Sequence, residues 1–96
     1  MLKFHSNTQE DLEIELSSRS TEVSIEIVKS ICEALEENAD QVFVGMLINL
    51  GLGLIINKQN YLNSLKLNFP TVEKAEEYEL CSRALNWINR LESDDI

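Results

Sequence analysis

The chain has 96 residues, of which 44% are hydrophobic and 26% are charged, and its formal net charge is −9. This length suits one domain with its own core, and the hydrophobic fraction argues against disorder throughout the chain. The acidic excess makes binding to nucleic acid or to an anionic membrane unfavourable, because phosphate groups repel negative charge.

We expect a single domain over residues 1–96, with residues 1–10 and 93–96 loosely ordered. The first twenty residues contain no apolar segment behind a basic start, so we expect no signal peptide and a cytoplasmic location. Cys32 and Cys81 are too few for a disulfide framework. We therefore expect two buried free thiols.

The first strong pattern covers residues 21–38 and predicts a helix. Its acidic residues fall on one side, and Ser20 or Thr21 can cap its first free amides. Apolar residues recur at helical spacing along the other side, at Val23, Ile27, Val28, Ile31, Ala34 and Leu35.

A second interpretation of this region stays open. Leu12, Ile14 and Leu16 alternate with polar residues, as do Val23, Ile25 and Ile27, and a period of two is typical of strands. Leu2 and Phe4 could add a third strand. In that case an N-terminal antiparallel β-meander would precede a short helix starting near Ser30, so residues 10–28 are either helix or hairpin.

Residues 41–56 carry no charge and predict a buried central helix, because a helix that is apolar on all sides belongs inside a core. Fifteen residues rise only about 22 Å, too short to span a membrane. Gly45, Asn49 and Gly53 would share one face and allow close helix packing. The alternative is two buried strands, Val42–Ile48 and Leu52–Asn57.

The C-terminal third predicts two further helices. Tyr61, Leu62 and Leu65 suit a short helix, and Leu67 with Phe69 suits an extended segment before Pro70. A longer helix is expected over residues 71–92, with Thr71 as its cap and acidic residues in its first turn.

These elements together predict a mainly α fold, with four or five helices packed as a small orthogonal or bundle-like domain around the central helix at residues 41–56. The alternative is an α+β fold with the N-terminal antiparallel β-meander. In either case we expect the uncharged middle of the chain to lie inside a layer of acidic amphipathic elements.

No residue set predicts catalysis or a cofactor. His5 is the single histidine, and three Cys and His residues in all are too few for a zinc site. The glycines at positions 51 and 53 lack the context of a phosphate-binding loop. We expect no enzyme activity, no cofactor and no metal site.

The remaining hypothesis is a protein-interaction module, such as an adaptor, an inhibitor or an immunity or antitoxin-like factor. Acidic helix faces would attract a protein partner, possibly basic, and an apolar anchor would hold it. The alternative is an obligate homo-oligomeric structural or assembly subunit that uses the Gly45, Asn49 and Gly53 face. The candidate partner-binding residues are Glu33, Glu36, Glu37, Asp40, Glu76, Glu79 and Trp87.

Overall fold

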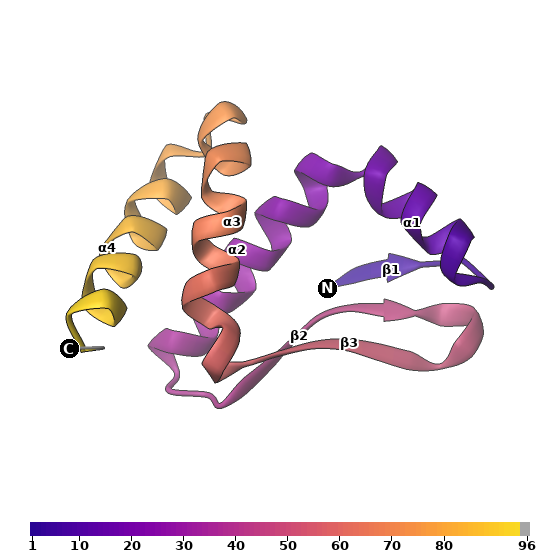
Figure 1. The fold of residues 1–96 in the computed structure, drawn as a ribbon, viewed down its shortest axis with the longest axis horizontal. Coiled ribbons are helices and arrows are strands. Elements are labelled where there is room, and N and C mark those ends of the chain that lie inside the picture. The colour runs from indigo at the N-terminus through magenta and orange to yellow at the C-terminus, as the bar shows by residue number, and fades with distance from the viewer. Residues whose placement is uncertain (95–96) are drawn as a thin grey trace.

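Helices form most of the fold, and a three-stranded sheet lies along them (Figure 1). The computed structural model describes residues 1–94. Two short 3₁₀ turns, Ile48–Leu50 and Lys58–Asn60, flank the third strand. The main elements in chain order are β1 (Leu2–Phe4), α1 (Gln9–Ser18), α2 (Ser20–Glu36), β2 (Gln41–Leu47), β3 (Leu52–Asn57), α3 (Tyr61–Lys74) and α4 (Tyr78–Asp94).

The sheet has the order β1-β2-β3. β1 pairs with β2 in parallel, so the chain needs a crossover between them, and α1 and α2 provide it. β2 and β3 form an antiparallel hairpin, with an irregularity between Phe43 and Gly45 that leaves Val44 as an extra residue. A hydrogen bond of 2.8 Å from the backbone N–H of Lys58 to the carbonyl of Asp40 closes the base of the hairpin.

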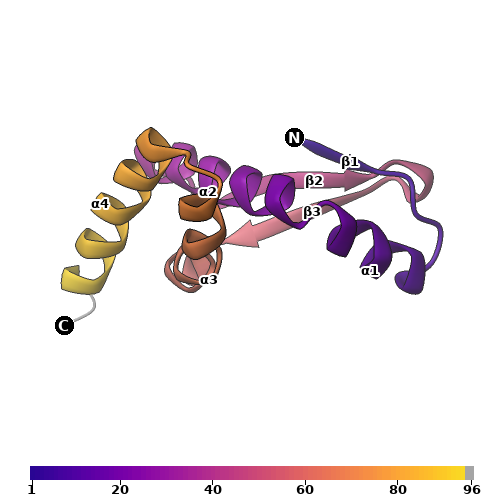
Figure 2. The ribbon, with the colours of Figure 1, turned by 90° about the horizontal axis from the view of Figure 1, so that it is seen from above.

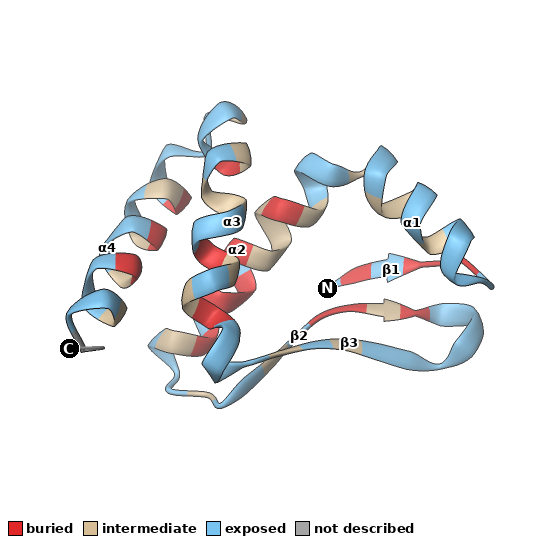
Figure 3. Ribbon diagram, in the orientation of Figure 1, coloured by how far each residue is buried: buried red, intermediate tan, exposed pale blue. Residues whose placement is uncertain are grey.

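Two hydrophobic clusters hold these elements together. The larger one lies between α2, α3 and α4, where Val28, Ile31, Leu65, Val72 and Ala84 are fully buried. The smaller one packs the sheet against α1 and the start of α2. It is built on Leu2, Phe4 and Leu47, with Leu12, Leu16, Val23 and Leu54 around them. Buried positions therefore follow the inner sides of the helices and the first two strands, whereas β3 is largely exposed (Figure 3).

The molecule is elongated, with principal extents of 41 × 28 × 20 Å. Seen from above, α4 lies at one end and the hairpin tip with α1 lies at the other (Figure 2). The two hydrophobic clusters thus follow one another along the long axis.

The predicted helix over residues 21–38 is confirmed as α2, and the antiparallel β-meander is wrong. α1 forms because Thr8 caps it, with its hydroxyl accepting from the Asp11 N–H at 3.1 Å. Leu12 and Leu16, four residues apart, then face the sheet together. Ile14, which completed the apparent alternation, is 64% exposed. The α+β class holds, but its N-terminal part contributes only one strand, Leu2–Phe4.

The predicted central helix over residues 41–56 is also wrong, because these residues form the β2–β3 hairpin. Each glycine would cost a helix about 1 kcal/mol, and Gly51 adopts a left-handed φ of 64° at the turn. Gly45, Asn49 and Gly53 therefore share no helix face. The alternative strands, Val42–Ile48 and Leu52–Asn57, come close to the observed bounds, but β3 is not buried.

The C-terminal helices differ from the prediction in their bounds. α3 continues through Pro70 to Lys74, so Thr71 lies inside a helix and caps none. The break falls at Glu76, which has a φ of 61°, and α4 begins at Tyr78. Burial of Val72 explains the continuation, because a helix that ended at Pro70 would leave this side chain outside the main cluster.

From the sequence, we expect residues 1–10 and 93–96 to be loosely ordered. Leu2 and Phe4 lie in β1 with their side chains buried. The Met1 ammonium lies 3.3 Å from a carboxylate oxygen of Glu26. Of the last four residues, 95 and 96 lie outside the described part of the chain.

Candidate interaction surface

The sheet has an inner and an outer face, and only the inner face is covered. Residues that pair across antiparallel strands point to the same side, and successive residues alternate. Leu54 on the inner face packs with the sheet cluster. Phe43 and Ile55, which pair with each other, point to the outer face. Within the described residues, neither of these two side chains belongs to a hydrophobic cluster.

On the outer face, the Phe43 ring makes a close contact with Gly53. A Cβ atom placed on Gly53 would come within 2.7 Å of Cε1 of Phe43, so the ring lies directly over this glycine. The absence of a side chain at Gly53 therefore leaves room for the Phe43 ring. The ring contacts the hairpin on this side, and 46% of the Phe43 surface is exposed.

Exposed apolar side chains concentrate on this hairpin. The described residues include ten exposed large hydrophobic side chains, and five of them lie between residues 43 and 55. Singly scattered exposed apolar residues are common on soluble proteins, whereas a contiguous group marks an interaction site. We call these five residues the hairpin surface: Phe43 and Ile55 on the outer face, Leu52, which pairs with the inner-facing Leu47, and Ile48 and Leu50 at the turn.

The charge distribution separates the hairpin surface from the rest of the molecule. No charged residue occurs from Gln41 to Asn57, and the nearest charges beside the strands include Lys3, which pairs opposite Met46, and Lys58, which follows β3. The acidic residues lie mostly on the helices. A partner can therefore cover the hairpin surface without removing a carboxylate from water, which would be costly.

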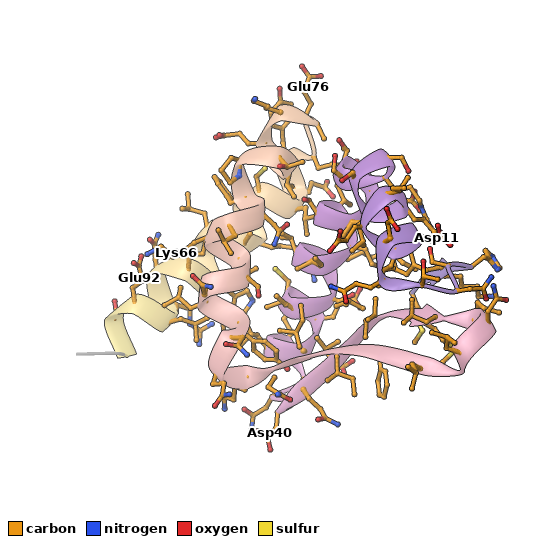
Figure 4. All side chains as sticks on the ribbon, turned by 45° about the vertical axis from the view of Figure 1, so that its right-hand side comes forward. Asp11, Asp40, Lys66, Glu76 and Glu92 are labelled. Atoms are coloured by element: carbon orange, nitrogen blue, oxygen red, sulfur yellow. The ribbon has the colours of Figure 1, made fainter. Side chains whose placement is uncertain are left out.

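The predicted acidic partner-binding residues do not form one site. Asp40 and Glu76 lie on opposite sides of the molecule, at the lower and upper margins of the view in Figure 4. Glu36 makes a two-pronged ion pair with Arg83 of α4, with distances of 2.9 and 3.2 Å from its carboxylate oxygens to Nη2 and Nε. This pair ties α2 to α4 and raises the pKa of Arg83. Glu33, Glu37 and Glu79 are exposed on their helices.

Trp87 lies at the edge of the main cluster. Its ring is half-buried against that cluster, and the Arg90 guanidinium lies 4.4 Å from the ring centroid on α4. A cation over an indole face is a favourable contact. Much of the ring is thus in contact with other side chains of the molecule.

The two cysteine thiols lie in surroundings that favour their neutral form. Burial raises the pKa of the Cys32 thiol to about 11. Burial and the nearby carboxylates of Glu73 and Glu77 raise the pKa of Cys81 as well. Across residues 1–94, no three His, Cys, Asp or Glu side chains come together in a way that could hold a metal ion.

Sequence reasoning missed the hairpin surface because it assigned the uncharged segment to the interior. The absence of charge was the correct signal, and Gly51 marked the turn. Whether such a segment is buried or open depends on how many elements cover it, and α1 and α2 cover only one face of this sheet.

None of the helices in the described part of the chain is long and apolar enough to cross a membrane. Comparison of the chain with protein-family models, with curated proteins and with solved structures finds no match.

Proposed function

We propose that this chain is a non-enzymatic protein-interaction module that binds a protein partner through the hairpin surface. The observation that carries the proposal is the grouping of half the exposed large apolar side chains on one uncharged hairpin. Phe43 provides an exposed aromatic anchor on the outer face of the hairpin, and such anchors account for much of the binding energy at protein interfaces.

The acidic helices have a separate role in this proposal. They surround the uncharged hairpin with negative potential, which attracts a basic partner over several ångströms before contact. Because salt screens such long-range attraction, added salt should slow association more than it speeds dissociation. The apolar contacts with the hairpin surface should be far less sensitive to salt.

The test compares three immobilised proteins: the wild type, the double variant Phe43→Ser/Ile55→Ser, and a matched control, Leu67→Ser/Leu85→Ser. The control also removes two exposed apolar side chains, but from α3 and α4. A protein retained from native lysate by the wild type is purified, and its affinity for all three chains is measured by calorimetry.

We expect the hairpin variant to lose at least about a hundredfold in affinity, which corresponds to about 2.7 kcal/mol, and the control to bind like the wild type. Equal binding by the hairpin variant and the wild type would overturn the proposal. Circular dichroism of each variant excludes unfolding as the cause of a loss.

A further inference from the structure

The two edge strands of the sheet, β1 and β3, differ in how well they are protected from pairing with another chain. β1 is only three residues long and carries a charged residue, Lys3, at its centre. Nη1 of Arg19 donates to the Lys3 carbonyl at 2.8 Å, and the Asn49 side-chain amide donates to the carbonyl of His5 just beyond the strand. Short length, a central lysine and capped carbonyls are the devices by which proteins keep an edge from pairing with another chain.

β3 forms the other edge and has none of these devices. It is six residues long, it contains no charge and no proline, and the bulge lies in its neighbour β2. Within the described residues, the backbone of β3 makes no hydrogen bond to a side chain or to an element other than β2. Toward the hairpin tip, Figure 1 shows this strand as the lower margin of the sheet.

We propose that β3 pairs with β3 of a second copy of this chain, antiparallel and around a two-fold axis, to give a six-stranded sheet. This inference goes beyond the proposed function and does not depend on it, because the occupant of the strand edge is a second copy of the chain itself. Unpaired backbone groups on an uncovered apolar strand are satisfied most directly by another strand.

The side chains of β3 fit this pairing when Leu54 lies opposite its own copy. Ile55 of one chain then lies opposite Gly53 of the other, because antiparallel partners run in opposite directions. The outer side of Gly53 has no side chain of its own and is covered by the Phe43 ring, whose exposed edge a neighbouring side chain can contact. Ile55 therefore fills a space beside an aromatic ring, and the two chains do so reciprocally, as a two-fold interface requires.

Each copy carries a net charge of −9, so two copies repel overall and the pairing needs a local attraction between opposite charges. Lys58 directly follows β3 at the base of the hairpin, and the hairpin tip lies beside the start of α1, where Leu50 lines one pocket with Gln9 and Leu12. Antiparallel pairing brings the base of one hairpin to the tip of the other. Lys58 of each chain thus approaches the acidic first turn of α1 in the other, which carries Glu10 and Asp11.

The experiment uses sedimentation equilibrium on the full chain and a charge-swap pair at position 55. Ile55 is 45% exposed, so Ile55→Lys and Ile55→Asp should both fold. In the two-fold pair the two copies of this residue are diagonal neighbours, so each variant alone places like charges together. We expect the wild type to be a dimer, each variant alone to be at least about a hundredfold weaker in self-association, and an equimolar mixture to form a dimer again.

Leu85→Lys, on α4, is the control and should dimerise like the wild type. If Ile55→Lys unfolds, Lys58→Glu replaces it, with weaker dimerisation expected from loss of the attraction to α1. A monomeric wild type at high protein concentration, or undiminished dimerisation of both variants, would overturn the inference. A monomer whose partner binding still depends on Phe43 would leave the proposed function standing, whereas a dimer without such binding would overturn the proposed function alone.

Discussion

The two cysteines differ in how their surroundings control their reactivity. Cys32 is fully buried on α2, whereas Cys81 is only partly covered on α4. With its pKa at about 11, the Cys32 thiol is ionised in roughly one molecule in a thousand at pH 8. Both thiols act as small apolar side chains at neutral pH, but solvent and reagents reach Cys81 more easily than Cys32.

We therefore expect a thiol reagent at pH 8 to modify one cysteine of the folded protein and the second only after unfolding. The release of a chromophore from a disulfide reagent, followed with and without denaturant, measures this. Cys81→Ser should abolish the reaction of the folded protein. Retention of that reaction in Cys81→Ser would show that Cys32 is open to solvent.

Glu15 connects the loop after β1 to the start of α2. Its carboxylate accepts from the Ser6 hydroxyl at 2.6 Å and from the His5 N–H at 3.3 Å, and it pairs with Arg19 at 3.2 Å. These contacts, the Ser6 hydrogen bond above all, lower the pKa of Glu15 below its usual value of 4.5. The carboxylate form is thus favoured more in the folded chain than in the unfolded chain.

A carboxylate whose pKa is lower in the folded chain contributes its full stabilisation at pH values above its pKa in the unfolded chain. This stabilisation is lost as the pH falls through the pKa of the folded chain. We expect Glu15→Gln to lower the melting temperature at pH 7, with a difference from the wild type that shrinks on acidification below pH 4.5. Thermal unfolding between pH 7 and pH 3 measures this. Glu10→Gln on the same helix is the control, and an unchanged difference at pH 3 would contradict the assigned role.

At the scale of elements, α3 accommodates a proline in its second half. Pro70 cannot donate a backbone hydrogen bond, and a proline inside a helix costs about 3 kcal/mol. The burial of Tyr61, Leu65 and Val72 along the same helix offsets this cost. The tertiary contacts of α3 therefore keep it continuous against its local preference.

Pro70→Ala restores the missing N–H and should raise the free energy of unfolding by about 1–3 kcal/mol. Urea unfolding followed by circular dichroism measures the change. A loss of stability would instead show that the helix depends on the proline, for example through a kink that α4 requires.

Gly45 and Gly53 differ in what surrounds them, although both lie in the hairpin. A Cβ atom on Gly45 would meet Cε2 of the buried Phe4 ring at 2.9 Å and the Leu2 carbonyl at 3.2 Å. This glycine lets β1 approach β2 closely. A Cβ atom on Gly53 would meet only the Phe43 ring, which is free to move toward solvent.

Gly45→Ala should therefore destabilise the protein by about 1–3 kcal/mol, whereas Gly53→Ala should change its stability by less than about 1 kcal/mol. Urea unfolding of both variants provides the comparison. Had residues 41–56 been a helix, both substitutions would have stabilised it, by about 1 kcal/mol each. Stabilisation by both would thus favour the helical interpretation over the hairpin.

Local patterns predicted α2 by its helical period, although the alternation of Val23, Ile25 and Ile27 left a strand interpretation open. They did not decide residues 41–56, because an apolar run fits a buried helix and a buried strand equally. They misplaced the α3–α4 break, since Pro70 was a stronger local signal than the φ of 61° at Glu76. The hairpin surface was beyond prediction, because exposure of Phe43 depends on the absence of a covering element.

At the scale of the whole molecule, charge and apolar exposure are separated in space. Acidic helices form most of the surface, and one uncharged hairpin extends alongside them with its outer face and its β3 edge open (Figures 1 and 3). In the proposed function, the acidic helices steer a partner by long-range attraction, and the uncharged hairpin provides the contact surface.

Amide hydrogen exchange of the hairpin at two protein concentrations tests this account most directly, since exchange rates report local opening and hydrogen bonding residue by residue. In dilute protein, half of the β3 amides should exchange quickly while those of α2 exchange slowly, and raising the concentration should slow exchange in β3 alone. Amides of β3 that are as protected as those of α2 in dilute protein, or that do not respond to concentration, would contradict an open strand that pairs with a second copy.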